Sequence, residues 1–254
     1  MGILYFFIVL VATTAGAIAG VGGGVLIKPT LDALGYYNLA TIGVLSSIAV
    51  LTMAVVSTMR RFISGLKVDK KIMLLAIGAI IGGFAGKEIF YRLLSVIEEP
   101  VIKIIQSVLI VLLMIVILFK DRLLRRCIEN PFAVLTAGFV LGVLASFLGI
   151  GGGPVNVAVL YLLLNMDIKK AAVGSIFIIL LAQTSKIVTI SLSQGFAAYD
   201  LKMLWYMVPA GIIGGLLGSF LHNRINEKTI NIIFNTTVVV VILICLYNIT
   251  EVFI

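Results

Sequence analysis

The chain alternates long, nearly uninterrupted hydrophobic runs with short polar segments. Eight of these runs contain 18 to 23 residues, about the length that an α-helix needs to cross the ~30 Å hydrocarbon core of a bilayer. Because membrane β-strands would alternate apolar and polar residues, the continuous runs exclude an outer-membrane barrel. The pattern predicts an all-α integral membrane protein with about eight transmembrane helices, at Ile3–Gly20, Thr41–Thr58, Ile72–Tyr91, Val101–Phe119, Phe132–Ile150, Ala171–Ser193, Met203–Leu221 and Ile230–Tyr247.

Two further hydrophobic stretches, Val25–Leu34 and Val155–Leu164, are too short to cross a membrane. Each follows a run of glycines, and a glycine costs about 1 kcal/mol relative to alanine inside a helix. Backbone without helical hydrogen bonds is tolerated at membrane depth only where it is buried in protein or faces a cavity. We therefore expect each stretch to be a half-helix or a re-entrant segment that follows a broken, Gly-rich segment.

Composition and charge agree with a membrane protein. Hydrophobic residues make up 61% of the 254 residues and charged residues 12%, whereas soluble domains have about 45–50% and about 25%. The net charge of +8 comes largely from two loops, 60–71 and 120–126, which hold nine of the 19 Lys and Arg residues. The positive-inside rule places these loops in the cytoplasm, and with eight crossings both termini would be cytoplasmic too. The charge therefore indicates a multi-pass protein of the cell (inner, cytoplasmic) membrane and not a nucleic-acid-binding protein.

Motifs of the first half of the chain recur in the same order 129 to 132 residues later. Gly20–Gly24 recurs as Gly149–Gly153, and Gly82–Gly86 recurs as Gly214–Gly218. This duplication predicts one transmembrane domain made of two four-span repeats, residues 1–127 and 128–254. If every run crosses, the repeats share one orientation, and if a Gly-rich segment does not cross, they are inverted.

The two glycine runs are the best candidates for a substrate site. Broken helices at equivalent places of two repeats are typical of transport sites. A helix that starts after each break, with Pro154 suited to the first position, would point free N–H groups and a positive dipole end at a small anion. We expect Gly23 and Gly152 to lie close together with the substrate between them. The candidate substrate-binding residues are Gly22, Gly23, Gly24, Gly151, Gly152, Gly153, Pro154, Asn156, Ser46, Gln183 and Lys186.

Several of these sequence features also have a purely structural interpretation. The glycine runs could serve only close helix packing, and Lys186 could extend toward the membrane interface. Lys28 precedes Asp32 by four residues, so the two charges are expected to neutralise each other on one helix face. Lys87 and Glu88, near the end of the third run, are expected at the interface.

Four-residue glycine spacing favours a packing role for another group of glycines. Alanine at Gly86 should therefore be milder than valine at Gly152. The packing glycines are Gly78, Gly82, Gly86, Gly214 and Gly218.

The Gly-rich repeats resemble those of the TauE/SafE family of membrane proteins, the sulfite exporter family. Its hallmark is a GxGGG segment followed by a proline, once in each half of a duplicated four-span unit. GVGGGVLIKP at 20–29 and GIGGGPVNVA at 149–158 are similar to the two copies. Lys28 stands where the family usually has an apolar residue, and Ala158 where it usually has proline. The resemblance covers essentially the whole chain and implies export or uptake of a small anion, typically sulfite or an organosulfonate.

The leading hypothesis is a secondary transporter for a small, sulfur-containing anion, bound near the membrane midplane between the repeats. An anion channel that uses the same Gly-rich site is the alternative. The spans contain no paired acidic residues, nucleophile–base pattern or HExxH motif, so we expect neither an enzyme nor catalytic residues, a metal site or a cofactor. The expected partners are the anion and the lipid bilayer, without nucleic acid, and a homo-oligomer is left open.

Overall fold

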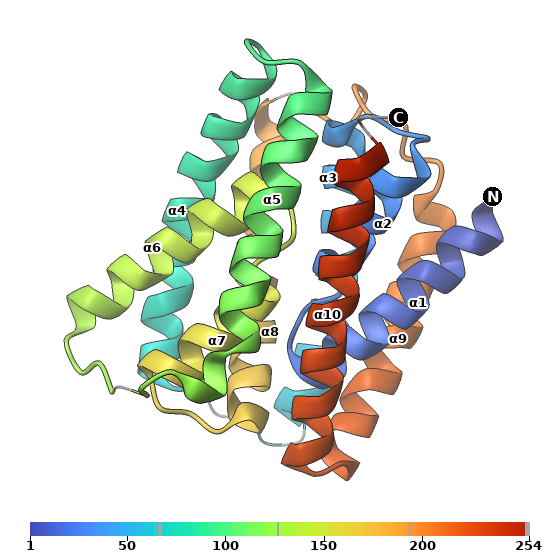
Figure 1. Ribbon diagram of the computed structural model, residues 1–254. Coiled ribbons are helices and arrows are strands. Elements are labelled where there is room, and N and C mark those ends of the chain that lie inside the picture. The colour runs from blue at the N-terminus through green and yellow to red at the C-terminus, as the bar shows by residue number, and fades with distance from the viewer. Residues whose placement is uncertain (64, 66–67, 126, 194, 252–254) are drawn as a thin grey trace.

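The computed structural model describes residues 1–63, 65, 68–125, 127–193 and 195–251. In these residues the chain forms ten α-helices and one short 3-10 helix, and the basic residues Lys67 and Arg126 lie outside them (Figure 1). The helices are α1 (Gly2–Ala19), α2 (Gly24–Leu34), α3 (Leu39–Ile63), α4 (Lys70–Leu94), α5 (Glu99–Leu118), η1 (Lys120–Arg122), α6 (Pro131–Leu148), α7 (Gly153–Leu163), α8 (Ile168–Ser193), α9 (Leu204–Arg224) and α10 (Glu227–Glu251).

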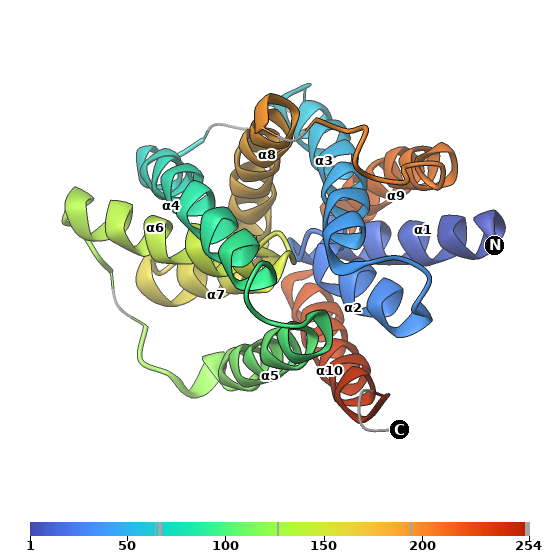
Figure 2. The ribbon, with the colours of Figure 1, turned by 90° about the horizontal axis from the view of Figure 1, so that it is seen from above.

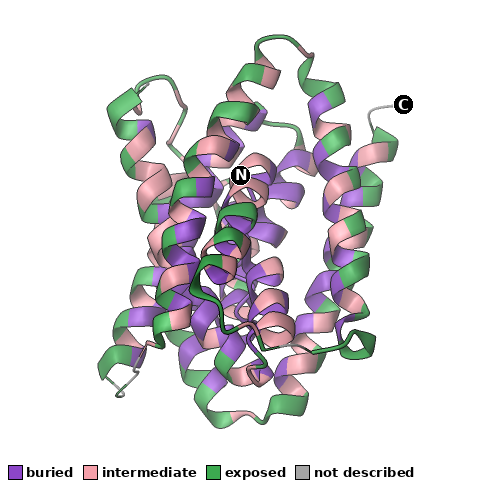
Figure 3. Ribbon diagram, turned by 90° about the vertical axis from the view of Figure 1, so that its left-hand side faces the viewer, coloured by how far each residue is buried: buried purple, intermediate pink, exposed green. Residues whose placement is uncertain are grey.

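The eight long hydrophobic runs all form helices, so the all-α membrane class is confirmed. Within the described residues, eight helices are long and apolar enough to cross a membrane, with mean hydropathies from 1.6 to 2.9. The two short stretches form α2 and α7, which have 11 residues each. Large apolar side chains such as Phe7, Leu112 and Trp205 face outward, and the buried positions lie on the inner sides of the helices (Figure 3). An apolar outer surface of this kind suits contact with lipid.

Helix is interrupted at both glycine runs. α1 ends at Ala19 and α2 begins at Gly24, and between them Gly20, Gly22 and Gly23 have φ values of 77°, 81° and 73°. L-residues with a β-carbon rarely adopt positive φ, whereas glycine does so without steric cost. The second break, between α6 and α7, has the same form, with positive φ at Gly149, Gly151 and Gly152.

The two broken pairs enter the molecule from opposite sides. In Figure 1, α1 starts and α2 ends near the side that carries both termini. In the second pair, α6 starts and α7 ends near the opposite side. We call these the terminal side and the basic side, because the last turn of α3, with Arg60 and Arg61, and helix η1, with Lys120 and Arg122, lie on the latter. Each broken pair therefore returns to its own side, which favours inverted repeats. The division into residues 1–127 and 128–254 stays a prediction.

The positions of the termini correct the expectation that they share a side with the basic loops. Glu251, at the end of α10, forms an ion pair with Lys103 near the start of α5, and the Lys120 loop follows the far end of that helix. Gly2 lies against Tyr206 at the start of α9. The expectation fails because it counted α1 and α6 as full crossings, whereas the α1–α2 pair and the α6–α7 pair each lead back to the side from which they start.

Glycine faces hold the tilted helices against their neighbours. Figure 2 shows α4 beside α6, α1 beside α9, and α5 beside α10. A β-carbon at Gly78, Gly82 or Gly86 would overlap a backbone carbonyl of α6, as the packing interpretation predicted. Alanine at Gly86 should be costly, since the β-carbon would meet the rigid backbone at Val143. That it is milder than valine at Gly152 stays a prediction.

Basic side chains cap the end of α1 at the first break. Arg61 Nη2 donates to the carbonyl oxygen of Ala17 at 2.9 Å, and His222 Nδ1 lies 2.7 Å from that of Ile18. Cationic and N–H donors at a helix C-terminus satisfy carbonyls that have no helical partner and oppose the dipole. Side chains from α3 and α9 therefore fix the place where α1 stops.

Candidate substrate site between the two helix breaks

The two breaks cross in the middle of the molecule and contact each other directly. A β-carbon at Gly24 would lie 2.8 Å from the carbonyl oxygen of Ile150, and one at Gly153 would overlap the carbonyl of Val21. The buried Ser175 Oγ of α8 lies 2.6 Å from Gly20 O and 3.2 Å from Gly153 O, within hydrogen-bonding distance of both breaks. Close backbone approach at this crossing explains why the last residue of each run has no side chain.

The nearest neighbours of Gly23 and Gly152 lie within their own broken pairs, and the expectation that the substrate lies between these two glycines stays a prediction. A β-carbon at Gly23 would lie 3.0 Å from the carbonyl oxygen of Ala12, and one at Gly152 would lie 2.8 Å from Ala145 Cβ. Each of these glycines therefore packs against the first helix of its own broken pair. Gly24 and Gly153 make the contact between the pairs instead.

A small cavity of about 30 Å³ lies beside the second break. Four of the predicted site residues line it: Gly151, Asn156, Gln183 and Lys186. α4, α6 and α8 supply the rest of its wall, which includes Ser146, Ser185, Thr189 and Lys87. The sequence brought Lys87 to notice only as an interface residue, whereas its stretch of α4 packs against α6 and so faces the cavity.

A second cavity of about 20 Å³ adjoins the first, and Ser146, Lys87 and Lys186 line both. Lys28 and Gln106 also line the second cavity. Three lysines therefore surround the two cavities, and no described lining residue is an Asp or Glu. Of these three, Lys28 also pairs with Asp32, which lies outside both linings, so Lys87 and Lys186 supply the unbalanced positive charge. Such charge in a poorly hydrated cavity attracts anions strongly, because little solvent screens it.

The two lysines shared by the cavities have weak or neutral partners. Lys186 Nζ lies 3.5 Å from the carbonyl oxygen of Gly43, and Lys87 Nζ donates to Ser193 Oγ at 2.9 Å. Among the described residues, neither ammonium forms an ion pair with a carboxylate. An ionisable group inside a membrane protein without a counter-ion is a functional candidate.

Polar groups near the second break also remain available. In the part of the chain that the structure describes, the backbone N–H groups of Gly151 and Gly152 have no hydrogen-bond acceptor. The side-chain oxygens of Gln183 and Ser46 are buried and likewise lack a described partner. Gln183 Nε2 would lie 2.6 Å from a β-carbon at Gly151, so the amide is packed tightly against the break.

The other predicted site residues do not line either cavity. Gly22 contacts Ile179 of α8, and Pro154 is buried near the start of α7. Ser46 lies buried in α3. The remaining glycines, Gly23, Gly24, Gly152 and Gly153, make the backbone contacts described above.

A helical membrane domain in which two oppositely inserted broken pairs cross beside a charged cavity has the architecture of a membrane transporter. The comparisons with known proteins give the particular family. Residues 5–244 match the family model described as Sulfite exporter TauE/SafE, and the chain belongs to this family. It is similar to the Probable membrane transporter protein YunE of Bacillus subtilis (strain 168), with 23% identity over 258 residues that cover 91% of this chain and 92% of that protein. No solved structure gives a significant match.

Proposed function

We propose that this protein is a secondary transporter of the cytoplasmic membrane for a small sulfur-containing anion, such as sulfite or an organosulfonate. The observation that carries the proposal is the set of three lysines, Lys28, Lys87 and Lys186, around two adjoining cavities without a lining carboxylate. The family name supports sulfite as the first substrate to test. The positive-inside rule supports a cytoplasmic location for the basic side.

The size of the cavities supports a small substrate. Their volumes are about 30 and 20 Å³, and one buried water molecule needs roughly 10–15 Å³ on this scale. An ion of a few heavy atoms therefore fits with modest side-chain movement, whereas a large organic anion does not. Asn156, Ser146 and the free N–H groups at the second break can donate hydrogen bonds to its oxygens, together with the lysine ammonium groups.

The crossing of the breaks supports an alternating-access mechanism. Two broken pairs inserted from opposite sides allow one to move relative to the other, so that the same site opens first to one side and then to the other. The proposal assigns transport and not catalysis to the site, and it needs no metal or cofactor. Whether copies associate does not affect it.

Counterflow in proteoliposomes tests the proposal. Purified protein is reconstituted into vesicles loaded with unlabelled sulfite, and uptake of radiolabelled sulfite, thiosulfate and methanesulfonate is followed against protein-free vesicles. A carrier gives uptake that saturates and that unlabelled internal anion accelerates. Flux without saturation or acceleration would identify an anion channel instead. Flux equal to that of empty vesicles for all three anions would refute the proposed function.

A further inference from the structure

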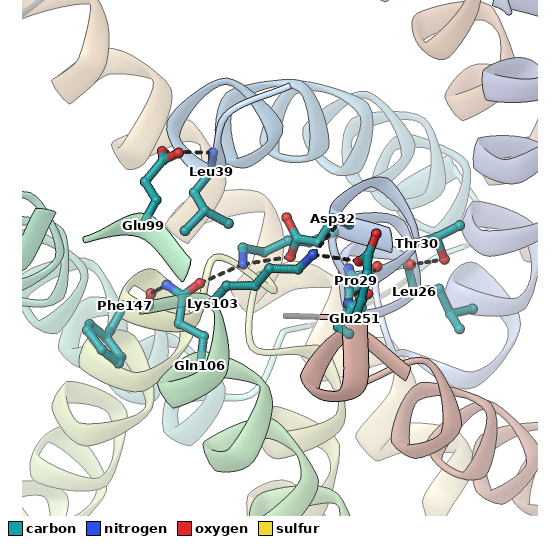
Figure 4. A network of polar contacts seen from close by, with 12 residues as sticks. Leu26, Pro29, Thr30, Asp32, Leu39, Glu99, Lys103, Gln106, Phe147 and Glu251 are labelled. Atoms are coloured by element: carbon teal, nitrogen blue, oxygen red, sulfur yellow. Dashed lines mark hydrogen bonds and ion pairs between the residues drawn. The ribbon is translucent and has the colours of Figure 1, made fainter. Parts of the chain in front are cut away.

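A buried ion pair in α2 lies directly beside the proposed substrate site (Figure 4). Lys28 and Asp32 are 2% and 6% exposed, and Lys28 Nζ lies 3.1 Å from Asp32 Oδ2. The pairing that the sequence predicted is therefore confirmed. Among the described residues, Asp32 is the one buried carboxylate, and every other buried ionisable group is a Lys, Arg or His, apart from Tyr5 and Cys245.

The two members of this pair face different cavities. Lys28 lines the second cavity of the substrate site together with Lys87 and Lys186. Asp32 instead lines a cavity of about 300 Å³ on the terminal side, and its Oδ1 has no hydrogen-bond partner in the described part of the chain. Asp32 thus borders the terminal-side cavity with one carboxylate oxygen unpaired, and the ammonium that neutralises it lines the proposed substrate site.

Charged groups from several helices surround Asp32. Lys103 of α5 donates to the Asp32 backbone oxygen at 3.0 Å and pairs with Glu251 of α10 at 2.9 Å. Glu99 and Tyr37 line the same cavity as Asp32, and Cys245 of α10 is close enough to interact electrostatically. Because Lys103 already forms an ion pair with Glu251, Lys28 is the cation that balances the Asp32 carboxylate.

Lys28 is also linked to the second break. Its Nζ donates to Gln106 Oε1 at 2.7 Å, and Gln106 Nε2 donates to the carbonyl oxygen of Phe147, near the end of α6 (Figure 4). The Lys28 side chain passes Gly149, where a β-carbon would lie 2.9 Å from Cε. These contacts connect Lys28 to the backbone where α6 ends.

We propose that Asp32 is the proton-binding site of this transporter and that Lys28 couples its protonation to binding of the anion; this rests on the proposed function. In the empty site, Lys28 pairs with Asp32. A bound anion competes for the Lys28 ammonium, and the carboxylate left behind takes one proton from the terminal-side cavity to become a carboxylic acid. For a monovalent anion, the charge of the site is zero before binding, when it holds the Lys28 ammonium and the Asp32 carboxylate. It is zero again afterwards, when it holds the Lys28 ammonium, the anion and the neutral Asp32 carboxylic acid.

Constant charge in the site is the physical reason for the coupling. An unpaired carboxylate in a buried environment is unfavourable, and protonation removes its charge. Anion binding without the proton would leave Asp32 ionised and without a partner, and proton binding without the anion would leave Lys28 unbalanced. Anion and proton are therefore expected to cross together.

The experiment compares anion exchange with proton movement in the same proteoliposomes. Vesicles contain a trapped pH-sensitive dye, and an inward gradient of sulfite, thiosulfate or methanesulfonate is applied to the wild type, Asp32→Asn and Glu227→Gln. Asparagine imitates the neutral carboxylic acid, so Asp32→Asn should keep counterflow but lose anion-driven proton uptake. Glu227→Gln removes an exposed carboxylate at the other end of α10 that lines none of these cavities, and it should keep both. Comparing variants with the same anion cancels any proton that the anion itself carries.

The results separate the coupling from the transport function. Wild-type counterflow without proton uptake beyond that of Asp32→Asn would overturn the coupling and leave the transporter intact. Absence of counterflow for all three anions would overturn the proposed function. If Asp32→Asn does not fold, the double variant Lys28→Met/Asp32→Asn removes both charges, and proton uptake that persists in it would also refute the role of Asp32.

Discussion

Alanine at Gly82 should destabilise the protein, whereas alanine at the adjacent Gly83 should not. A β-carbon at Gly82 would overlap the carbonyl of Phe139, and nothing lies within 4 Å of one at Gly83. Both residues are inside α4, so both substitutions gain the same helix propensity of about 1 kcal/mol. The pair therefore isolates the cost of the contact between α4 and α6.

The expected loss of stability in Gly82→Ala follows from the number of close contacts that are broken when the added β-carbon pushes α6 away from α4. Five glycines make such contacts along this interface: Gly78, Gly82 and Gly86 on α4, and Gly138 and Gly142 on α6. Each brings a backbone carbonyl close to an α-carbon, a contact worth roughly 0.5 kcal/mol. Loss of all five, offset by the gain in propensity, leaves Gly82→Ala less stable by about 1–2 kcal/mol, and Gly83→Ala should be more stable than the wild type by up to about 1 kcal/mol.

Reversible unfolding of the purified protein in mixed micelles, with denaturing detergent as the variable, measures both values. Equal stability of Gly82→Ala and Gly83→Ala would show that the helices are not held by close glycine contacts. The same result would remove the reason given for expecting a severe effect at Gly86.

Three further predictions concern the site and the orientation. Lys186→Gln should reduce sulfite counterflow by more than about tenfold with unchanged yield, because a hydrogen bond to a charged group contributes roughly 1.5–3 kcal/mol; normal flux would remove Lys186 from the site. Gly152→Val should abolish counterflow, since φ is 73° and the β-carbon would lie 2.8 Å from Ala145 Cβ, and wild-type flux would show that the break tolerates side chains. Cys127 is exposed and Cys245 is buried, so an impermeant maleimide should label only Cys127, and only in inside-out vesicles; labelling in intact cells would place the basic side outside.

The sequence by itself determined the membrane class, the helices and the breaks. The length of a hydrophobic run is a local property of the sequence, and it determines whether a helix can span the bilayer. The eight long runs therefore form helices, with ends shifted by only a few residues. The breaks were equally predictable, because consecutive glycines weaken a helix wherever they stand. The Lys28–Asp32 pair also depended only on spacing along one helix.

Only the tertiary structure decided which way the segments run and what they touch. A hydrophobic run of 18 residues has the same composition whether it crosses fully or tilts and returns through a half-helix, so counting runs gave the wrong side for the termini. Sequence could not distinguish the two glycines that contact the opposite break, Gly24 and Gly153, from their neighbours. Lys87 joined Lys186 at the cavities because α4 packs on α6. The depth of a residue in the membrane and its spatial neighbours depend on packing between helices that are distant in the sequence, and no local sequence pattern encodes that packing.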